Sequence, residues 1–345
     1  MAPPQAPLKD LTIDNITENV HAINSGCDDP RMRFLFEKLV IHLHDFARET
    51  RLTTHEWETA IKFLTQVGQI CTEVRQEFIL LSDILGLSLL VDSIDHPKPA
   101  ASTEGTVLGP FHTHEAETVQ NGTSISQDPD GEPMLVVCTV KDTQGRPLPD
   151  VKVDVWETDS KGFYDVQYAD RNGPDGRAIV RSDQEGSFFF NAIVPVPYPI
   201  PSDGPVGKLL KKLHRHPYRP SHFHFMFDKP GYDRLITQVF IAPVWSIILI
   251  SRRALYLRGD PYERSDAVFG VKESLVVDLL KVSDVEGLAE KYKVDPSTRL
   301  LKYDFVLVTD KEASDLRDQK ALEAMEKQGA TGMIIINGVL VPDVD

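Results

Sequence analysis

The hydrophobic periodicity of the chain changes at His96-Pro97-Lys98-Pro99, and this change limits the folds that the chain can adopt. Before it, apolar residues recur every three to four positions, which is the spacing of one helix face. After it, Val151-Lys-Val-Asp-Val-Trp156 alternates with period two, as a half-buried strand requires. The two prolines end the helical pattern because proline cannot continue a helix. The sequence therefore predicts a helical N-terminal region followed by a strand-rich region.

Three helices are expected before residue 96. Asp29-Pro30 suits the start of the first, and its residues Leu35, Leu39, Leu43 and Phe46 fall on one face. Thr53 and Glu56 fit a capping box that opens the second helix. Residues 77–91 form a third, very apolar helix, which is typical of a core or a subunit interface.

Strands are expected over 134–141, 151–156, 187–190 and 222–227, with turns at 142–147 and 184–186. Residues 100–310 therefore predict an antiparallel β-sandwich with long loops, and the fold class is mainly β with α. We expect a helical N-terminal dimerisation domain over 1–100 and a catalytic domain over 101–345. A helix over 314–328 and a short strand over 332–340 are expected near the C-terminus.

Composition excludes several classes of partner. The formal net charge of −15 argues against nucleic acid and anionic membranes, since both need basic patches. The longest apolar run, 240–250, is too short to span a bilayer, and residues 1–20 do not resemble a signal peptide. Three widely spaced cysteines, Cys27, Cys71 and Cys138, form no disulfide framework, which favours a reduced, cytoplasmic chain.

The predicted secondary structure separates two of the His-x-His pairs in the chain. His222 and His224 lie on a predicted strand, where residues i and i+2 point to the same face and can reach one metal ion. His42 and His44 lie on a predicted helix, where positions i and i+2 do not share a face. We interpret His42 and His44 as ordinary helix residues.

Two tyrosines stand in settings that favour a ligand role. Tyr164 ends the strand-turn unit Trp156-Glu-Thr-Asp-Ser-Lys-Gly-Phe-Tyr164, and Tyr198 lies between two prolines that fix its backbone. Most tyrosines are half-buried aromatic residues, and a phenolate forms only where a strong cation stabilises it. Phenolate and imidazole together suit a hard trivalent cation such as Fe(III).

The order of these motifs resembles that of the intradiol ring-cleavage dioxygenases. The matching segments are Gly109-Pro-Phe111, Trp156 to Tyr164, Tyr198-Pro-Ile-Pro201, Arg219-Pro-Ser-His-Phe-His224, Asp260-Pro-Tyr262 and Asp266-Ala-Val-Phe269. The resemblance covers roughly residues 10 to 310. It implies one Fe(III) per chain, bound by Tyr164, Tyr198, His222 and His224 with a hydroxide, and a homodimer formed through the N-terminal helices.

The resemblance also implies the reaction and its catalytic residues. A small aromatic diol or triol reacts with O2 and is opened between two hydroxyl-bearing carbons. Arg219 stabilises negative charge on the activated substrate, and Tyr198 leaves the metal and accepts a proton. The expected pocket residues are Leu80, Asp83, Val107, Leu108, Gly109, Pro110, Phe111, Ile200, Pro201, Arg219 and Gln238.

Asp83 carries the expected substrate preference. It lies in the apolar stretch Leu80-Leu-Ser-Asp-Ile-Leu-Gly86, where a carboxylate is costly without a partner. The Leu-Leu-Ser-Asp element resembles hydroxyquinol 1,2-dioxygenases, so Asp83 could accept a hydrogen bond from a third substrate hydroxyl and the product would be maleylacetate. The alternatives are a catechol 1,2-dioxygenase giving cis,cis-muconate, with Asp83 bonded to backbone or to Arg75.

Two readings from other classes compete with a dioxygenase. A non-catalytic transthyretin-like or peptidase-associated β-sandwich binding module would share the segment 139–158, but it needs neither the tyrosines nor the helical region. A cupin-like metal enzyme also uses His-x-His, but it requires a carboxylate ligand downstream.

One segment departs from the family pattern. Leu235-Ile-Thr237 joined directly to Ala254-Leu-Tyr-Leu-Arg-Gly-Asp-Pro-Tyr262 would give a strand and turn of the family type. We therefore hypothesise that 238–253 is an insertion and that its deletion preserves activity, because only one of two candidate strands can fill the slot. Gln238 is a pocket residue only if the strand continues through 237–240.

Overall fold

A computed structural model describes residues 10–72, 75–170, 173–242 and 260–343 of the chain. Their contacts divide the chain into two compact units. The first combines residues up to Gln66 with those from Ser314 onward, and the second spans Val67–Ala313. The expected dimerisation domain of 1–100 and catalytic domain of 101–345 were assigned by function. A division by contacts does not test them, so they stay a prediction.

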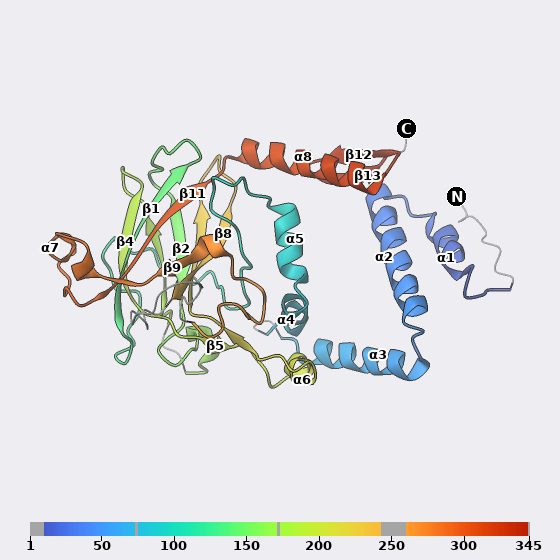
Figure 1. The fold of residues 1–345 in the computed structure, drawn as a ribbon, viewed down its shortest axis with the longest axis horizontal. Coiled ribbons are helices and arrows are strands. Elements are labelled where there is room, and N and C mark those ends of the chain that lie inside the picture. The colour runs from blue at the N-terminus through green and yellow to red at the C-terminus, as the bar shows by residue number, and fades with distance from the viewer. Residues whose placement is uncertain (1–9, 73–74, 171–172, 243–259, 344–345) are drawn as a thin grey trace, which may run out of the picture. The chain divides into compact units, whose positions relative to one another are not determined.

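The larger unit contains two β-sheets (Figure 1). One has the strand order β10-β11-β1-β4, formed by Leu280–Lys281, Arg299–Leu307, Pro133–Asp142 and Ser187–Ile193. The other has the order β3-β2-β7-β8-β9, formed by Arg177–Arg181, Lys152–Trp156, His222–Asp228, Leu235–Ala242 and Val276–Asp278. A short pair joins β5 (Tyr198–Pro199) to β6 (Tyr218–Arg219). The predicted fold class is confirmed, but the sheets are mixed, because β1 pairs with β11 and β8 with β9 in parallel.

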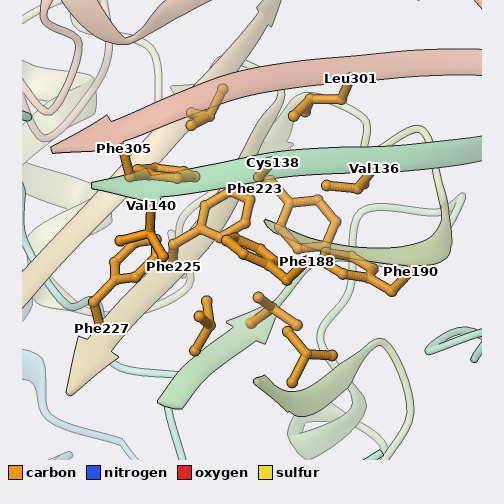
Figure 2. Close-up of a cluster of buried hydrophobic side chains, with 14 of the residues drawn as sticks. Val136, Cys138, Val140, Phe188, Phe190, Phe223, Phe225, Phe227, Leu301 and Phe305 are labelled. Atoms are coloured by element: carbon orange, nitrogen blue, oxygen red, sulfur yellow. The ribbon is translucent and has the colours of Figure 1, made fainter. Parts of the chain in front are cut away.

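The two sheets share one hydrophobic core. Alternate residues of β1 and β4 face alternate residues of β7, so that the period-two pattern of each strand supplies one buried side. Figure 2 shows the aromatic centre of this core, with Phe188 and Phe190 from β4, Phe223, Phe225 and Phe227 from β7, and Phe305 from β11. The face of β7 that points away from this core is therefore the face left for polar chemistry.

Phe305→Ala is expected to lower the free energy of unfolding by about 3–5 kcal/mol, the usual cost of deleting a fully buried phenylalanine. The Phe305 ring is inaccessible and lies 4.5 Å from the ring of Phe227 and 4.9 Å from that of Phe225. Urea denaturation of the variant measures the loss. Phe163→Ala is the control, because Phe163 is 46% exposed and should cost much less. Equal losses in the two variants would contradict this core assignment.

The helical region is confirmed with changed boundaries. The helices of this region are α1 (Ile16–Asn24), α2 (Pro30–Glu49), α3 (Thr54–Gln69), α4 (Glu77–Ile84) and α5 (Leu87–Asp95). Two further helices, α6 (Pro205–Lys212) and α7 (Leu288–Tyr292), lie among the strands in the sequence. Asp29 caps α2 by accepting a hydrogen bond from the Met32 amide. The Thr53 and Glu56 capping box is present at α3. The single helix expected over 77–91 is wrong, because Gly86 adopts a left-handed φ of 73° and divides α4 from α5.

The C-terminal residues form more structure than expected. Helix α8 (Asp310–Gln328) begins four residues earlier than predicted, and the single expected strand is a hairpin of β12 (Met333–Ile336) and β13 (Val339–Pro342). The hairpin packs on α2 within the smaller unit, where the Arg31 guanidinium donates a 2.6 Å hydrogen bond to the Leu340 carbonyl. Thr17 of α1 bonds to His44 of α2, so His44 is an ordinary helix residue, as interpreted from the sequence.

The insertion hypothesis for 238–253 is wrong for its first residues. Gln238 pairs with His224, and Phe240 with His222, in the continuous ladder between β7 and β8. Gln238 is fully buried, and its side chain is hydrogen bonded at both ends. Deletion of 238–253 would remove these strand positions, so we no longer expect it to preserve activity. Residues 243–253 lie outside the described part of the chain.

Candidate metal centre

The two histidines of β7 present their imidazoles on one side of the strand. His222 and His224 are both 2% exposed, and Phe223 between them points into the sandwich core. The Nε2 atoms of the two histidines are 3.2 Å apart. The Nδ1 atom of His222 lies 2.7 Å from the Pro220 carbonyl oxygen, so Nδ1 donates a hydrogen bond and Nε2 carries the lone pair that a metal would use.

Tyr164 completes a cluster of converging donor atoms. Its hydroxyl oxygen lies 3.1 Å from His224 Nε2 and 3.5 Å from His222 Nε2. A turn holds the residue, since the Tyr164 amide donates to Gln167 Oε1 at 2.8 Å. Its ring is 1% exposed and stacks on Phe111 with centroids 4.8 Å apart. Packing on both sides therefore fixes the direction of the hydroxyl.

Tyr198 approaches the same point from the short strand β5. Its ring stands edge-on to that of Tyr164, with centroids 5.5 Å apart and an interplanar angle of 88°. Its centroid is 5.6 Å from that of His222. Gly162 makes this approach possible, because a Cβ there would lie 3.0 Å from the Tyr198 Cβ and the backbone has a φ of 82°. The structure therefore brings together all four predicted ligands.

The spacing of the donor atoms fits a bound metal ion. Ligand bonds of about 2.0–2.2 Å at roughly right angles separate neighbouring donor atoms by about 3 Å, which is the spacing of this cluster. Burial and the nearby Arg219 charge lower the pKa of His222 to about 3, so the imidazole is neutral, as a ligand must be. Burial raises the pKa of Tyr164 well above its usual value, and only a strong cation would stabilise its phenolate there.

The residue types also separate the competing interpretations. Among the residues that the structure describes, no three His, Cys, Asp or Glu side chains gather to hold a metal ion. The carboxylate ligand expected of a cupin-like enzyme is therefore missing from this part of the chain. Buried phenols that converge on two neutral imidazoles favour the dioxygenase interpretation over a non-catalytic sandwich.

Arg219 lies directly beside the donor cluster. It pairs with Tyr198 across β5 and β6, and its Nη1 atom is 3.1 Å from His222 Nε2. Its Nη2 atom donates to Gln238 Oε1 at 2.6 Å. Burial alone would lower the pKa of Arg219, but the charge of Asp266 raises it above its ordinary value. The site therefore contains a permanent buried cation next to the metal-binding atoms.

The loop before β1 forms one wall of the site. Gln238 Nε2 donates to the Val107 carbonyl at 2.9 Å, which ties this loop to β8. A Cβ on Gly109 would lie 3.6 Å from His224 Cε1, and Phe111 stacks on Tyr164 as described above. Val107 is buried and Pro110 half-buried, whereas Leu108 is 36% exposed and turns away from the buried core.

The remaining predicted pocket residues come from α4 and the segment after β5. Leu80 and Asp83 are buried in α4, Ile200 is buried, and Pro201 is half-buried. Burial raises the pKa of Asp83, while a Ser88 hydrogen bond and the Arg219 charge lower it in part. Of the two alternative partners for Asp83, Arg75 bonds to Glu77 and Asp203 instead, and the backbone alternative stays open. Asp83 therefore lies within electrostatic reach of Arg219.

Several residues of the site had no predicted role. The Trp156 ring stacks on His224 with centroids 4.5 Å apart and planes at 12°. His112 lies edge-on to the Trp156 ring and bonds to Asp154 at 3.1 Å. The buried pair of Arg177 and Asp165 braces the Tyr164 turn. Of these residues, only Trp156 could have been identified from the sequence, because it opens the motif that ends at Tyr164. The others form pairs that no local pattern marks.

Comparisons with known proteins cover nearly the whole chain. Residues 29–103 match the family described as catechol dioxygenase N terminus, and residues 107–309 match the family described as dioxygenase. The chain is 65% identical to the intradiol ring-cleavage dioxygenase hqdA of Aspergillus niger, over 98% of this chain and 97% of that protein. It is 43% identical to a hydroxyquinol 1,2-dioxygenase of a Rhizobium species, over 84% and 93% of the two chains.

The fold agrees with these matches. A crystal structure of hydroxyquinol 1,2-dioxygenase from Pseudomonas putida superimposes with a TM-score of 0.76 at 39% identity, covering 86% of this chain and 99% of that one. A catechol 1,2-dioxygenase of Candida albicans is 37% identical over 87% and 94% of the two chains.

Proposed function

This chain belongs to the intradiol ring-cleavage dioxygenases, and we propose that it opens hydroxyquinol with O2, using one non-haem Fe(III) per chain. The ring opens between its two adjacent hydroxyl-bearing carbons and gives maleylacetate. Both oxygen atoms of O2 enter the product, so the reaction balances without a further oxidant or reductant. The observation that carries the proposal is the convergence of Tyr164, His222 and His224 within 3.1–3.5 Å, beside Tyr198 and Arg219.

The metal would be held by Tyr164, Tyr198, His222 and His224. When bound there, Fe(III) supplies a Lewis acid that holds the two vicinal oxygens of the substrate and activates the ring toward O2. Buried, neutral imidazoles and fixed phenol rings pre-organise this donor set, so little rearrangement is needed on binding. The resemblance to the family supports this assignment of iron.

Tyr198 accepts a proton from the substrate in this proposal. It sits on a strand of only two residues, and its ring is 4% exposed beside the rings of Tyr164 and His222. As one of the residues that would hold the metal, Tyr198 would also present its phenol oxygen to a substrate hydroxyl as the proton acceptor.

Arg219 stabilises the negative charge of the activated substrate. Its Nε and Nη2 atoms are committed to Asp266 and Gln238, and its Nη1 atom faces the lone pair of His222. With His222 as a metal ligand that lone pair would be occupied, and the Nη1 hydrogens would be free for the substrate. A fixed donor in a water-poor site then faces the charge that develops on the substrate.

Asp83 supports hydroxyquinol over catechol as the substrate. A buried carboxylate near the site can bind a third ring hydroxyl, which catechol lacks. The similarity to a hydroxyquinol 1,2-dioxygenase over most of both chains also supports this choice. Catechol cleavage to cis,cis-muconate remains the second candidate, since a catechol 1,2-dioxygenase is also a relative.

The direct test is to purify the protein, measure its iron and follow ring opening of hydroxyquinol and catechol. We expect about one iron per chain, a visible phenolate-to-iron band, and a higher kcat/KM for hydroxyquinol. Colourless protein with stoichiometric zinc, or iron-loaded protein that opens neither ring, would refute the proposed function. A preference for catechol would refute only the choice of substrate.

We further propose that the protein is a cytoplasmic homodimer that associates through its N-terminal helices. Helix α2 exposes 46–56% of each of Met32, Leu35, Phe36, Leu39, Leu43 and Phe46. A continuous apolar face of this size is typical of an interaction surface. No helix among the described residues is long and apolar enough to cross a membrane.

Light scattering at micromolar concentration is expected to give twice the 38.7 kDa mass of one chain. Leu39→Glu should shift the protein toward the monomer, because it places a charge in the centre of the apolar face of α2. Glu37→Lys, on the same helix, is the control and should leave the mass unchanged. A wild-type monomer would contradict the proposed association.

A further inference from the structure

The guanidinium of Arg219 is held by an acidic partner that lies 47 residues further along the chain. Asp266 accepts hydrogen bonds from Arg219 Nε at 3.1 Å and from Arg219 Nη2 at 3.2 Å. This is a two-oxygen, two-nitrogen pair, and both side chains are at most 3% exposed. Such a pair fixes the plane of the guanidinium as well as its position.

Asp266 is itself fixed by the backbone around it. Its Oδ1 atom accepts from the Val268 amide at 3.2 Å, and its Oδ2 atom accepts from the Gly270 amide at 2.9 Å. The next residue, Ala267, donates its amide to the Tyr218 carbonyl at 3.1 Å, which joins this turn to β6. The carboxylate therefore has little freedom to follow a moving arginine.

Gly270 leaves the space that this arrangement needs. A Cβ on Gly270 would lie 2.8 Å from Arg219 Nη2, 3.1 Å from Asp266 Oδ2 and 3.4 Å from Gln238 Oε1. The first of these distances is too short for a real contact, so any side chain at position 270 would displace the guanidinium or its partners. Its φ lies outside the left-handed region, so the requirement for glycine at this position comes from contact alone.

We propose that Asp266 is a positioning residue that, with the space left by Gly270, holds the Arg219 guanidinium so that only Nη1 faces the metal and the substrate. This inference rests on the proposed function. An arginine side chain has many rotamers, and a free one would have to be ordered during the reaction. Asp266 orders it beforehand, so that the donor is already in place when negative charge develops.

The charges of the pair agree with this role. Burial opposes ionisation of Asp266, but the Arg219 cation holds the Asp266 pKa below its usual range. An alternative role for Asp266 is to offset the positive charge of Arg219 and so weaken the binding of an anionic substrate. The two roles predict different effects on turnover and on substrate affinity.

Two variants disturb the pair in different ways. Asp266→Asn removes the negative charge but keeps the size of the side chain. Gly270→Ala keeps both charges but pushes on Nη2. The matched control is Asp142→Asn. Asp142 is also buried, at 1% exposure, accepts from two backbone amides and pairs with Arg146 in the turn that follows β1.

For each variant, kcat is measured per bound iron with hydroxyquinol, and the substrate Kd is measured without O2 from the change in visible absorption. We expect Asp266→Asn and Gly270→Ala each to lower kcat by about 10- to 100-fold, the cost of a donor misplaced by roughly 1 Å. The Kd should change less than about threefold, and Asp142→Asn should retain wild-type kcat and Kd.

A double variant completes the test. In an Arg219→Leu background, Asp266→Asn should cause no further loss of kcat, because no guanidinium is left to position. The proposal is overturned if both single variants keep wild-type kcat, if Asp266→Asn only tightens substrate binding, or if the two changes multiply. If wild-type protein opens no ring, the proposed function fails instead. The pair can still be tested by urea denaturation, in which the effects of Asp266→Asn and Arg219→Leu on the free energy of unfolding should not add if the pair is formed.

Discussion

Tyr164→Phe is expected to remove both the bound iron and the ring-cleavage activity of the protein. The substitution deletes one oxygen, which lies 3.1 Å from His224 Nε2 and 3.5 Å from His222 Nε2. The phenylalanine ring would keep the stack on Phe111, so the fold should be preserved. Mutation of a group that only supports a ligand typically costs about 10- to 100-fold in metal affinity, and loss of a ligand itself costs more.

The measurements are iron per chain, visible absorption and activity after identical purification. Tyr168→Phe is the matched control, because it also deletes a tyrosine hydroxyl that is hydrogen bonded, here to Asp159, close to the same turn. It should keep its iron and its colour. If Tyr164→Phe retained stoichiometric iron and an unchanged visible band, Tyr164 would not be a ligand and the proposed centre would be wrong.

The four proposed donor residues could be singled out from the sequence because each is marked by a local pattern. His222 and His224 share a face through the period of one strand, and Tyr198 is flanked by prolines. Tyr164 ends a strand-turn unit that the resemblance to a known family made recognisable. In each case the residue that matters lies within a few positions of the residues that identify it, so no knowledge of the tertiary structure is needed.

The residues that support the donors could not be predicted in the same way. Asp266 opens a segment that resembles the family, but its partner Arg219 lies 47 residues away, and His112 reaches Asp154 across 42. Each pair depends on which segments the sandwich brings side by side, and a buried carboxylate has the same local sequence whether its partner is near or far. Gln238 shows the same limit, because only its pairing with His224 in the β-ladder decides that it belongs to the site.

The fold was predictable to the extent that periodicity determines it. Strand positions followed from alternation, but strand direction did not, since the parallel pairing of β1 with β11 joins segments about 165 residues apart, such as Thr139 and Asp304. The break between α4 and α5 was missed for a related reason. Gly86 is tolerated inside an apolar helix pattern, and its left-handed φ is decided by packing.

Asp83→Ala is expected to lower the preference for hydroxyquinol over catechol by about 10- to 150-fold in the ratio of kcat/KM. This range corresponds to about 1.5–3 kcal/mol, the value of one hydrogen bond to a charged group. The third hydroxyl of hydroxyquinol would lose its partner, whereas catechol has no group at that position. The loss should therefore fall on hydroxyquinol, and catechol turnover should change little.

Helix α4 offers a matched control for this substitution. Glu77 is another buried acid on the same helix. Its partners are the Arg75 guanidinium and the Val206 amide in the first turn of α6. Glu77→Gln should lower the thermal midpoint and leave the substrate ratio unchanged, because its contacts are structural. An equal loss on both substrates in Asp83→Ala would show that Asp83 holds the fold of α4 and does not select the substrate. Asp83 also interacts electrostatically with Arg219, so its removal changes the charge around Arg219. That change affects both substrates alike and cancels in the ratio of their kcat/KM values. This ratio is therefore the quantity to measure.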